Sequence, residues 1–274
     1  MRNRLTVRAL LMALVLALLT LLVPAALADE EAAAAIVLTD EGVVVPEGLT
    51  AGVVPLLLQN DTEEAFFAPF LLGLTEGYTL EDLEAAFAED PNVPPEWIVM
   101  YGGTSVEPGA VVEAQFLLEA GEYAVLDFAS EMPVPVGFTV AEATEEAGEL
   151  PEADVVVSLL DFAFSVPAEL SAGPQLWEFV NEGAQWHELV LLNLGDAELT
   201  QDELMDLLMT SEEMPAGMEM VFTWLPVSEG TSTWANLDLE PGNYAMLCFL
   251  PDLASEEMMP HAMHGMISLV TVSE

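Results

Sequence analysis

The chain has 274 residues, of which 48 are acidic and only three are Lys or Arg, so its net charge is −45. This charge repels nucleic acid phosphates and anionic lipids, so we expect no nucleic acid partner and favour cations or basic proteins. Because 53% of the residues are hydrophobic, the chain is not a disordered acidic tail. We therefore expect folded domains with an acidic, solvated surface.

Residues 1–28 begin with three arginines, continue as an apolar run and end in Ala-Leu-Ala before Asp29. This order is typical of a secretory signal peptide that is cleaved after Ala28. The Ala-x-Ala site and Pro24 favour cleavage over a retained membrane anchor. No later segment is apolar for long enough to span a bilayer. We therefore expect an exported protein (periplasmic, on the cell surface or secreted) that is not an integral membrane protein after cleavage.

The rest of the chain resembles itself when it is shifted by 121 residues. The sequence VPEGLTAG (45–52) then falls on VPAELSAG (166–173), and AGEYAVLDF falls on the similar EPGNYAMLCF. We interpret this as a duplication of one unit. It predicts a first domain over 29–140, an acidic linker over 141–153 and a second domain over 154–274.

Both units consist mostly of short β-branched or aromatic runs that are bounded by Pro, Gly, Asn or Asp. Their number and spacing predict an all-β fold of two Greek-key β-sandwich domains. Each unit also carries one short helical insertion, over 79–89 and over 199–210. Thr79 and Thr200 are the expected N-caps of these helices.

The residues with metal-binding chemistry are concentrated in the second unit, which holds the chain's single cysteine and all of its histidines: His187, Cys248, His261 and His264. One cysteine cannot form an internal disulfide. In an oxidising compartment it must be buried, paired with another chain, reactive or bound to a metal. In the first unit the matching positions of His187 and Cys248 are Phe66 and Asp127, so we expect that unit to be metal-free.

Three segments of the second unit resemble plastocyanin-like type 1 copper proteins of the cupredoxin superfamily: FVNEGAQWHELVL, PGNYAMLC and HAMHGMISLVTV. The resemblance covers about residues 154–274 and, more faintly, 34–140. It implies cupredoxin-like sandwiches and one copper ion in the second domain. It also implies that the protein carries single electrons to or from a redox protein partner and is not an enzyme. The acidic surface favours a basic partner at low salt.

The resemblance also implies the ligands. His187, Cys248 and His261 would be the equatorial ligands, Met266 would be the axial ligand, and Asn181 would support the site by joining the two ligand loops through hydrogen bonds. A thiolate, two imidazoles and a weak thioether suit both Cu(I) and Cu(II). A zinc site with the same residues is also possible, although zinc prefers four firm ligands.

The sequence departs from the family in the twelve residues between Cys248 and His261, because the corresponding loop of the family is only a few residues long. The copper assignment requires this segment to return to its starting point. His264 is an alternative to His261 as a ligand. Methionine-rich loops support a second interpretation, an extracytoplasmic copper chaperone or store. A third is a metal-free binding or structural protein.

Overall fold

A computed structural model describes residues 33–274 except 90–93, 131–132, 145–148, 168 and 212–213. The predicted signal peptide lies outside the described residues, as does part of the predicted linker. Residues Ala34–Glu274 form one compact unit. In the part of the chain that is described, no helix is both long and apolar enough to cross a membrane.

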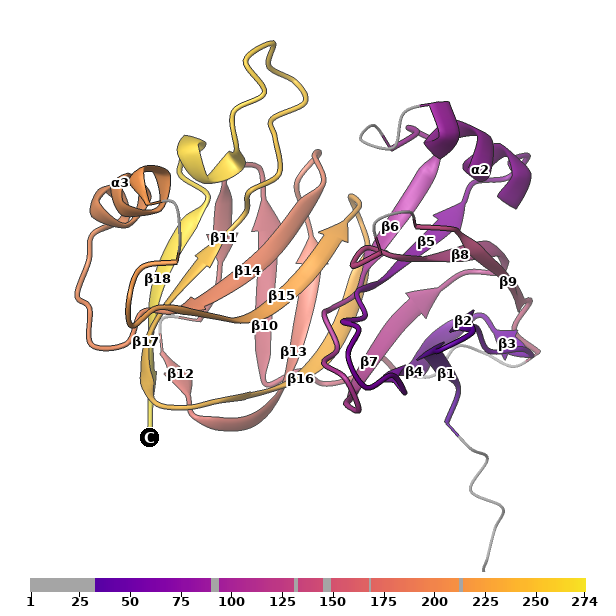
Figure 1. The fold of residues 1–274 in the computed structure, drawn as a ribbon, viewed down its shortest axis with the longest axis horizontal. Coiled ribbons are helices and arrows are strands. Elements are labelled where there is room, and N and C mark those ends of the chain that lie inside the picture. Colours follow the sequence, from indigo (N-terminus) through magenta and orange to yellow (C-terminus); the bar gives the residue numbers. More distant parts are fainter. Residues whose placement is uncertain (1–32, 90–93, 131–132, 145–148, 168, 212–213) are drawn as a thin grey trace, which may run out of the picture. The chain divides into compact units, whose positions relative to one another are not determined.

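The elements fall into two successive sets (Figure 1). The first set consists of β1 (Ala35–Thr39), β2 (Gly42–Val44), β3 (Leu49–Thr50), β4 (Gly52–Asn60), β5 (Pro69–Leu74), α2 (Leu80–Glu89), β6 (Ile98–Gly102), β7 (Val111–Leu118), β8 (Gly121–Asp127) and β9 (Val136–Ala141).

The second set consists of β10 (Val155–Leu160), β11 (Ala163–Ser165), β12 (Leu170–Ser171), β13 (Gly173–Asn181), β14 (His187–Asn193), α3 (Gln201–Thr210), β15 (Glu219–Val227), β16 (Ser232–Leu239), β17 (Gly242–Leu247), the 3-10 helix η1 (His261–His264) and β18 (Ile267–Ser273). Five elements of the first set, β2, β3, β4, β7 and α2, have bounds that differ by 121 from those of β11, β12, β13, β16 and α3. The shift found in the sequence therefore also relates the elements, and its interpretation as a duplication remains a prediction.

Each set forms a sandwich of two sheets. In the second set the strand orders are β11-β10-β13-β16 and β12-β18-β17-β14-β15, and the first set repeats them with β2-β1-β4-β7 and β3-β9-β8-β5-β6. Buried side chains from both sheets meet in one core, among them Val157 on β10, Phe179 on β13 and Met246 on β17. The predicted all-β class with two sandwiches is confirmed.

The sheets continue from one set into the other, because β7 pairs with β16 and β6 pairs with β15. This produces one sheet of 8 strands and one of 10 strands among the described residues. Buried residues alternate with half-buried or exposed ones along β10 and the second half of β13, because side chains alternate between the two faces of a strand and one face meets the core.

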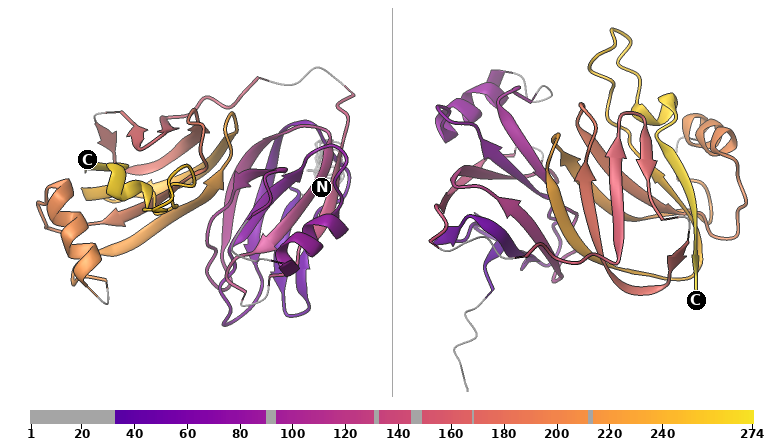
Figure 2. Two further views of the ribbon diagram at one scale, coloured as in Figure 1. Left: turned by 90° about the horizontal axis from the view of Figure 1, so that it is seen from above. Right: turned by 180° about the vertical axis from the view of Figure 1, so that it is seen from behind.

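The two helices cover outer faces of the larger sheet. Leu204 of α3 is fully buried in a cluster with residues of β14, β17 and β18, and Leu83 of α2 is buried against β5, β6 and β8. Figure 2 shows α3 as the orange helix beside the strands of the second set. Thr200 is the N-cap of α3 and forms a capping box with Glu203, which confirms the predicted start of this helix.

Candidate metal centre

The site lies where three elements of the second sandwich begin or end. β14 and β17 are antiparallel with Val190 opposite Leu247, so the first residue of β14, His187, lies near the residue that follows β17, Cys248. His261 is the first residue of η1, which precedes the last strand. All three side chains are fully buried. The pairing of β14 with β17 therefore accounts for the proximity of His187 and Cys248.

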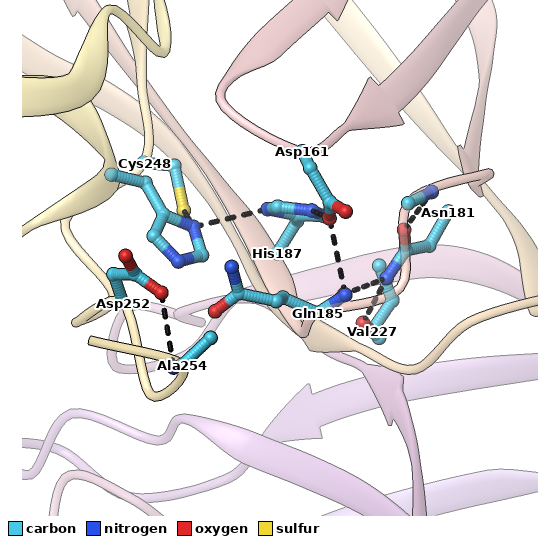
Figure 3. Close-up of polar contacts among 10 residues, drawn as sticks. Asp161, Asn181, Gln185, His187, Val227, Cys248, Asp252 and Ala254 are labelled. Carbon is cyan, nitrogen blue, oxygen red and sulfur yellow. Dashed lines mark hydrogen bonds and ion pairs between the residues drawn. The ribbon is translucent and has the colours of Figure 1, made fainter.

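The three side chains form one compact cluster, and Figure 3 labels two of them, His187 and Cys248. The two imidazoles face each other through Nδ1 atoms 3.1 Å apart, and Cys248 Sγ is 3.5 Å from His261 Nδ1. One donor atom from each residue lies within 4.8 Å of the other two. The geometry thus brings together the three residues that the sequence assigned as equatorial ligands.

The segment between Cys248 and His261 returns to its starting point. Pro251 and Pro260 form an antiparallel bridge, and Asp252 N–H donates to the Met259 carbonyl at 2.9 Å. His261 N–H then donates to the Leu250 carbonyl at 2.8 Å. The excursion is therefore a closed projection, visible in yellow beyond the end of β17 (Figure 1), and its length does not displace His261 from Cys248.

Met266 follows η1 and is fully buried in the same core as Cys248. Its N–H donates to the His261 carbonyl at 3.0 Å, and its carbonyl accepts from Cys248 N–H at 3.4 Å. These bonds place its backbone next to both ligand candidates. His264 is exposed, its Nε2 lies 3.7 Å from Asp252 Oδ2, and it is not part of the buried cluster.

Burial keeps these side chains uncharged in the protein without metal. Desolvation raises the pKa of the Cys248 thiol to about 12 and, together with the neighbouring His187, lowers the pKa of His261 to about 4. Desolvation also lowers the pKa of His187, against the opposite effect of Asp161. Because a metal ligand must be deprotonated, binding of a metal here releases the thiol proton.

The donor set fits a soft or borderline metal. Metal sites have distances of about 2.0 Å to imidazole nitrogen and about 2.3 Å to thiolate sulfur, so the two nitrogens, 3.1 Å apart, are close enough that both histidines could hold one ion. A thiolate with two imidazoles is typical of trigonal copper sites. His261 Nε2 is buried without a hydrogen-bond partner, whereas Nδ1 faces the other two side chains, so Nδ1 is the nitrogen that this ring offers to the cluster.

Asn181 does not join the two ligand loops, so this expectation was wrong. Its Nδ2 donates to the carbonyls of Gln185 and Val227, each at 2.8 Å, and its Oδ1 accepts from Gly183 N–H (Figure 3). Among the described residues these bonds connect the loop before His187 to β15 and to no residue between Cys248 and Met266.

The first sandwich explains the role of Asn181, because Asn60 makes the same bonds there. Asn60 Nδ2 donates to the carbonyls of Ala65 and Val106, and its Oδ1 accepts from Thr62 N–H. The first sandwich has no histidine. This network therefore belongs to the sandwich itself and is formed whether or not ligands are present.

Glu188 makes the connection that was expected of Asn181. Its Oε1 accepts from Phe249 N–H at 3.0 Å, which ties the residue after His187 to the residue after Cys248. Desolvation raises the pKa of Glu188. The second acid that the sequence did not single out is Asp161, whose Oδ1 lies 3.1 Å from His187 Nε2. Acidic residues are so frequent in this chain that composition gave no reason to select these two.

The first sandwich has other residues at the ligand positions. Val106 pairs with Phe67, as Val227 pairs with His187, so the structural counterpart of His187 is the buried Phe67 and not Phe66. At the position of Cys248, Asp127 accepts from the N–H groups of Ala68 and Ala129 at 3.0 Å each. The described part of this sandwich contains no group of His, Cys, Asp and Glu of the kind that could hold a metal.

The fold and the buried cluster define a protein of two β-sandwiches with one candidate His₂Cys metal centre. No protein-family model matches the chain, and no curated protein matches it in sequence. Solved structures do match. Auracyanin B has a TM-score of 0.31 and 20% identity over 48% of this chain and 96% of that chain. Sodium-dithionite-reduced auracyanin from the photosynthetic bacterium Roseiflexus castenholzii has a TM-score of 0.27 and 19% identity over 43% of this chain and 95% of that chain.

The blue copper oxidase from Nitrosomonas europaea has a TM-score of 0.23 and 12% identity over 83% of this chain and 75% of that chain. The likeness concerns the fold, and no activity is transferred from it.

Proposed function

We propose that this chain is an exported type 1 copper protein that carries single electrons and is not an enzyme. His187, Cys248 and His261 are its equatorial ligands and Met266 is its axial ligand, in a second domain over 154–274. The first domain, 29–140, holds no metal. The single observation that carries the proposal is the buried cluster of one thiol and two imidazoles at the ends of β14 and β17 and the start of η1.

Bound copper supplies a centre that gains and loses one electron with little rearrangement in such a site. The chain's own contribution is a set of neutral, buried donors held by secondary structure. Backbone bonds fix each donor, including Ala262 N–H to the Cys248 carbonyl at 2.8 Å. A redox protein partner with a basic surface suits the strongly acidic chain.

Addition of Cu(II) to the purified protein tests the proposal. We expect an intense visible band from the thiolate–copper bond, because the thiolate is an equatorial donor. Cys248→Ser removes the sulfur and should abolish the band. His261→Ala should do the same, whereas His264→Ala, three residues away and exposed, is the matched control and should retain it. A band that survives Cys248→Ser contradicts the ligand assignment.

A copper chaperone or store is the second candidate, and the exposure of methionines favours it. Among the described residues the exposed methionines are all in the second set of elements or its loops: Met209, Met214, Met220, Met258 and Met263. Thioethers at the surface are suitable ligands for Cu(I). Tight Cu(I) binding by the Cys248→Ser variant, with no visible band in the wild type, would favour this function over electron transfer.

A further inference from the structure

The turn between β10 and β11 covers the candidate metal centre. Leu160 pairs with Ala163, so the turn consists of two residues, Asp161 and Phe162. Phe162 has a φ of 64°, and it is one of two non-glycine residues with positive φ among those described. A bulky side chain in this left-handed region is uncommon, and such conformations persist where the surroundings determine them.

Asp161 contacts one of the two clustered histidines. Its Oδ1 lies 3.1 Å from His187 Nε2 and accepts from Gln185 N–H at 3.1 Å (Figure 3). His187 Nδ1 faces His261, so the Asp161 carboxylate contacts the other ring nitrogen, which points away from the cluster. A carboxylate on the outer nitrogen fixes the tautomer and the ring orientation of a metal-binding histidine.

Phe162 contacts the other clustered histidine. Its ring is perpendicular to that of His261, with centroids 5.2 Å apart at 89°, and it also lies 4.8 Å from the His264 ring. His261 is fully buried, and its Nε2 has no hydrogen-bond partner. A buried ring nitrogen without a partner is unusual in a folded protein, and here the Phe162 ring packs perpendicular to this imidazole.

We propose that the Asp161–Phe162 turn is part of the metal centre, in which Asp161 positions His187 for binding through Nδ1 and Phe162 closes His261 to solvent. The inference rests on the proposed metal site. It identifies two positioning residues that neither the ligand motifs nor the repeat points to. The equivalent turn of the first sandwich, Asp40–Glu41, is exposed and lies in a sandwich without histidines, so it provides matched controls.

The test of Phe162 uses the metal-free protein. Phe162→Gly and Phe162→Asn remove the ring with residues that tolerate positive φ, so the turn is retained. We expect diethylpyrocarbonate to modify His261 several-fold faster in both variants, because the ring that packs against the buried imidazole is removed. Added N-acetylhistidine is the reactivity standard, because Phe162 also contacts His264. Glu41→Gly is the matched control, and circular dichroism verifies folding. Unchanged protection of His261 in the folded variants would overturn the role of Phe162.

The test of Asp161 uses Cu(II) titration followed by the visible band. Asp161→Ala removes the acceptor and should weaken affinity about tenfold or more. Asp161→Asn keeps an oxygen acceptor and should restore affinity and band position, while Asp40→Ala should change neither. Equal affinity of Asp161→Ala and wild type would overturn the role of Asp161. Failure of the wild type to take up copper would instead reject the proposed function, so the two failures are distinguishable.

Discussion

The two nitrogens of His261 have different surroundings, and this predicts how the ring titrates. Nδ1 faces Cys248 and His187, while Nε2 is buried without a partner, so adding a proton places a charge in an apolar core. Desolvation is the main reason that the pKa of His261 is lowered to about 4. The unfolded chain binds this proton at the ordinary histidine pKa, about 6.5.

We therefore expect a midpoint near 4 for His261 in an NMR titration of the metal-free protein. The stabilising contribution of the neutral ring is complete above the unfolded pKa and is lost as the pH falls from there through the folded pKa. His261→Gln identifies the resonance. A midpoint between 6 and 7, the ordinary range for an exposed histidine, would show that the ring is solvated.

Glu188 provides a second prediction at this scale. Its carboxylate accepts from Phe249 N–H across the gap between the His187 strand and the Cys248 loop. Glu188→Ala leaves that N–H without its partner and should lower the free energy of unfolding by about 1 kcal/mol. Glu188→Gln keeps an oxygen acceptor and should retain most of the stability. Urea unfolding of the metal-free variants measures both, and an alanine variant as stable as the wild type would exclude this role.

At the scale of elements, the excursion from Phe249 to Pro260 is the main departure from the cupredoxin pattern that the ligand segments resemble. Its base is closed by the bond from Asp252 N–H to the Met259 carbonyl, and the residues beyond it, 253–258, are mostly exposed. Replacing 253–258 by Asn-Gly should preserve the base, because this pair favours the tight turn that joins two antiparallel strands.

The shortened protein should bind Cu(II) with the same visible band as the wild type, since none of the three clustered side chains is removed. As the control, the same residues are replaced by a longer Gly-Ser segment, which changes the sequence of the excursion without introducing the tight turn. Loss of the band in the Asn-Gly variant alone would mean that the excursion itself shapes the metal centre.

The elements also show what the sequence could predict. Both helices and most strands could be predicted from local pattern and from the 121-residue shift, because a repeated pattern of apolar and turn residues is visible without tertiary information. The His187, Cys248 and His261 cluster could be anticipated because Cys and His are rare here. The predicted counterpart of His187 was wrong by one residue, because Phe67 is seven residues after Asn60 whereas His187 is six residues after Asn181.

The roles of Asp161, Glu188 and Asn181 could not be predicted from the sequence. Asp161 and Glu188 are distinguished from the other acids only by the partners that the folded chain places beside them. Asn181 matched the family position, but its donors reach Val227 on β15, a partner 46 residues away. Hydrogen bonds between distant segments depend on tertiary geometry, which the local sequence pattern does not reveal.

At the scale of the whole described molecule, the first sandwich pairs with edge strands of the second sandwich, which holds the candidate ligands. β7 and β16 occupy equivalent positions and pair antiparallel, with Ala114 opposite its own counterpart Ala235. Phe116 of β7 stacks on Trp224 of β15, with centroids 6.0 Å apart. Unpaired edge strands invite association with other chains. The first sandwich therefore has a structural role for the second even without a metal.

The charge of the molecule leads to the last prediction. All three arginines lie in residues 1–8, outside the described residues, and the ion pairs found among the described residues involve histidine. The 48 carboxylates therefore have no Lys or Arg partner in the sandwiches and repel one another. Mobile ions screen such repulsion over about 10 Å at 0.1 M salt. The compact state, which holds the charges closer together than the unfolded chain, gains more from this screening.

We expect the melting temperature of the metal-free protein to rise by several degrees between about 0.02 M and about 0.5 M NaCl, a range over which the screening length falls several-fold. KCl and tetramethylammonium chloride at the same concentrations separate screening from specific binding of Na⁺, because screening depends only on ionic strength. Equal rises with all three salts support screening. Melts that do not move with any of them would show that the acidic surface does not limit stability, and a rise with one cation alone would indicate a specific site for that cation.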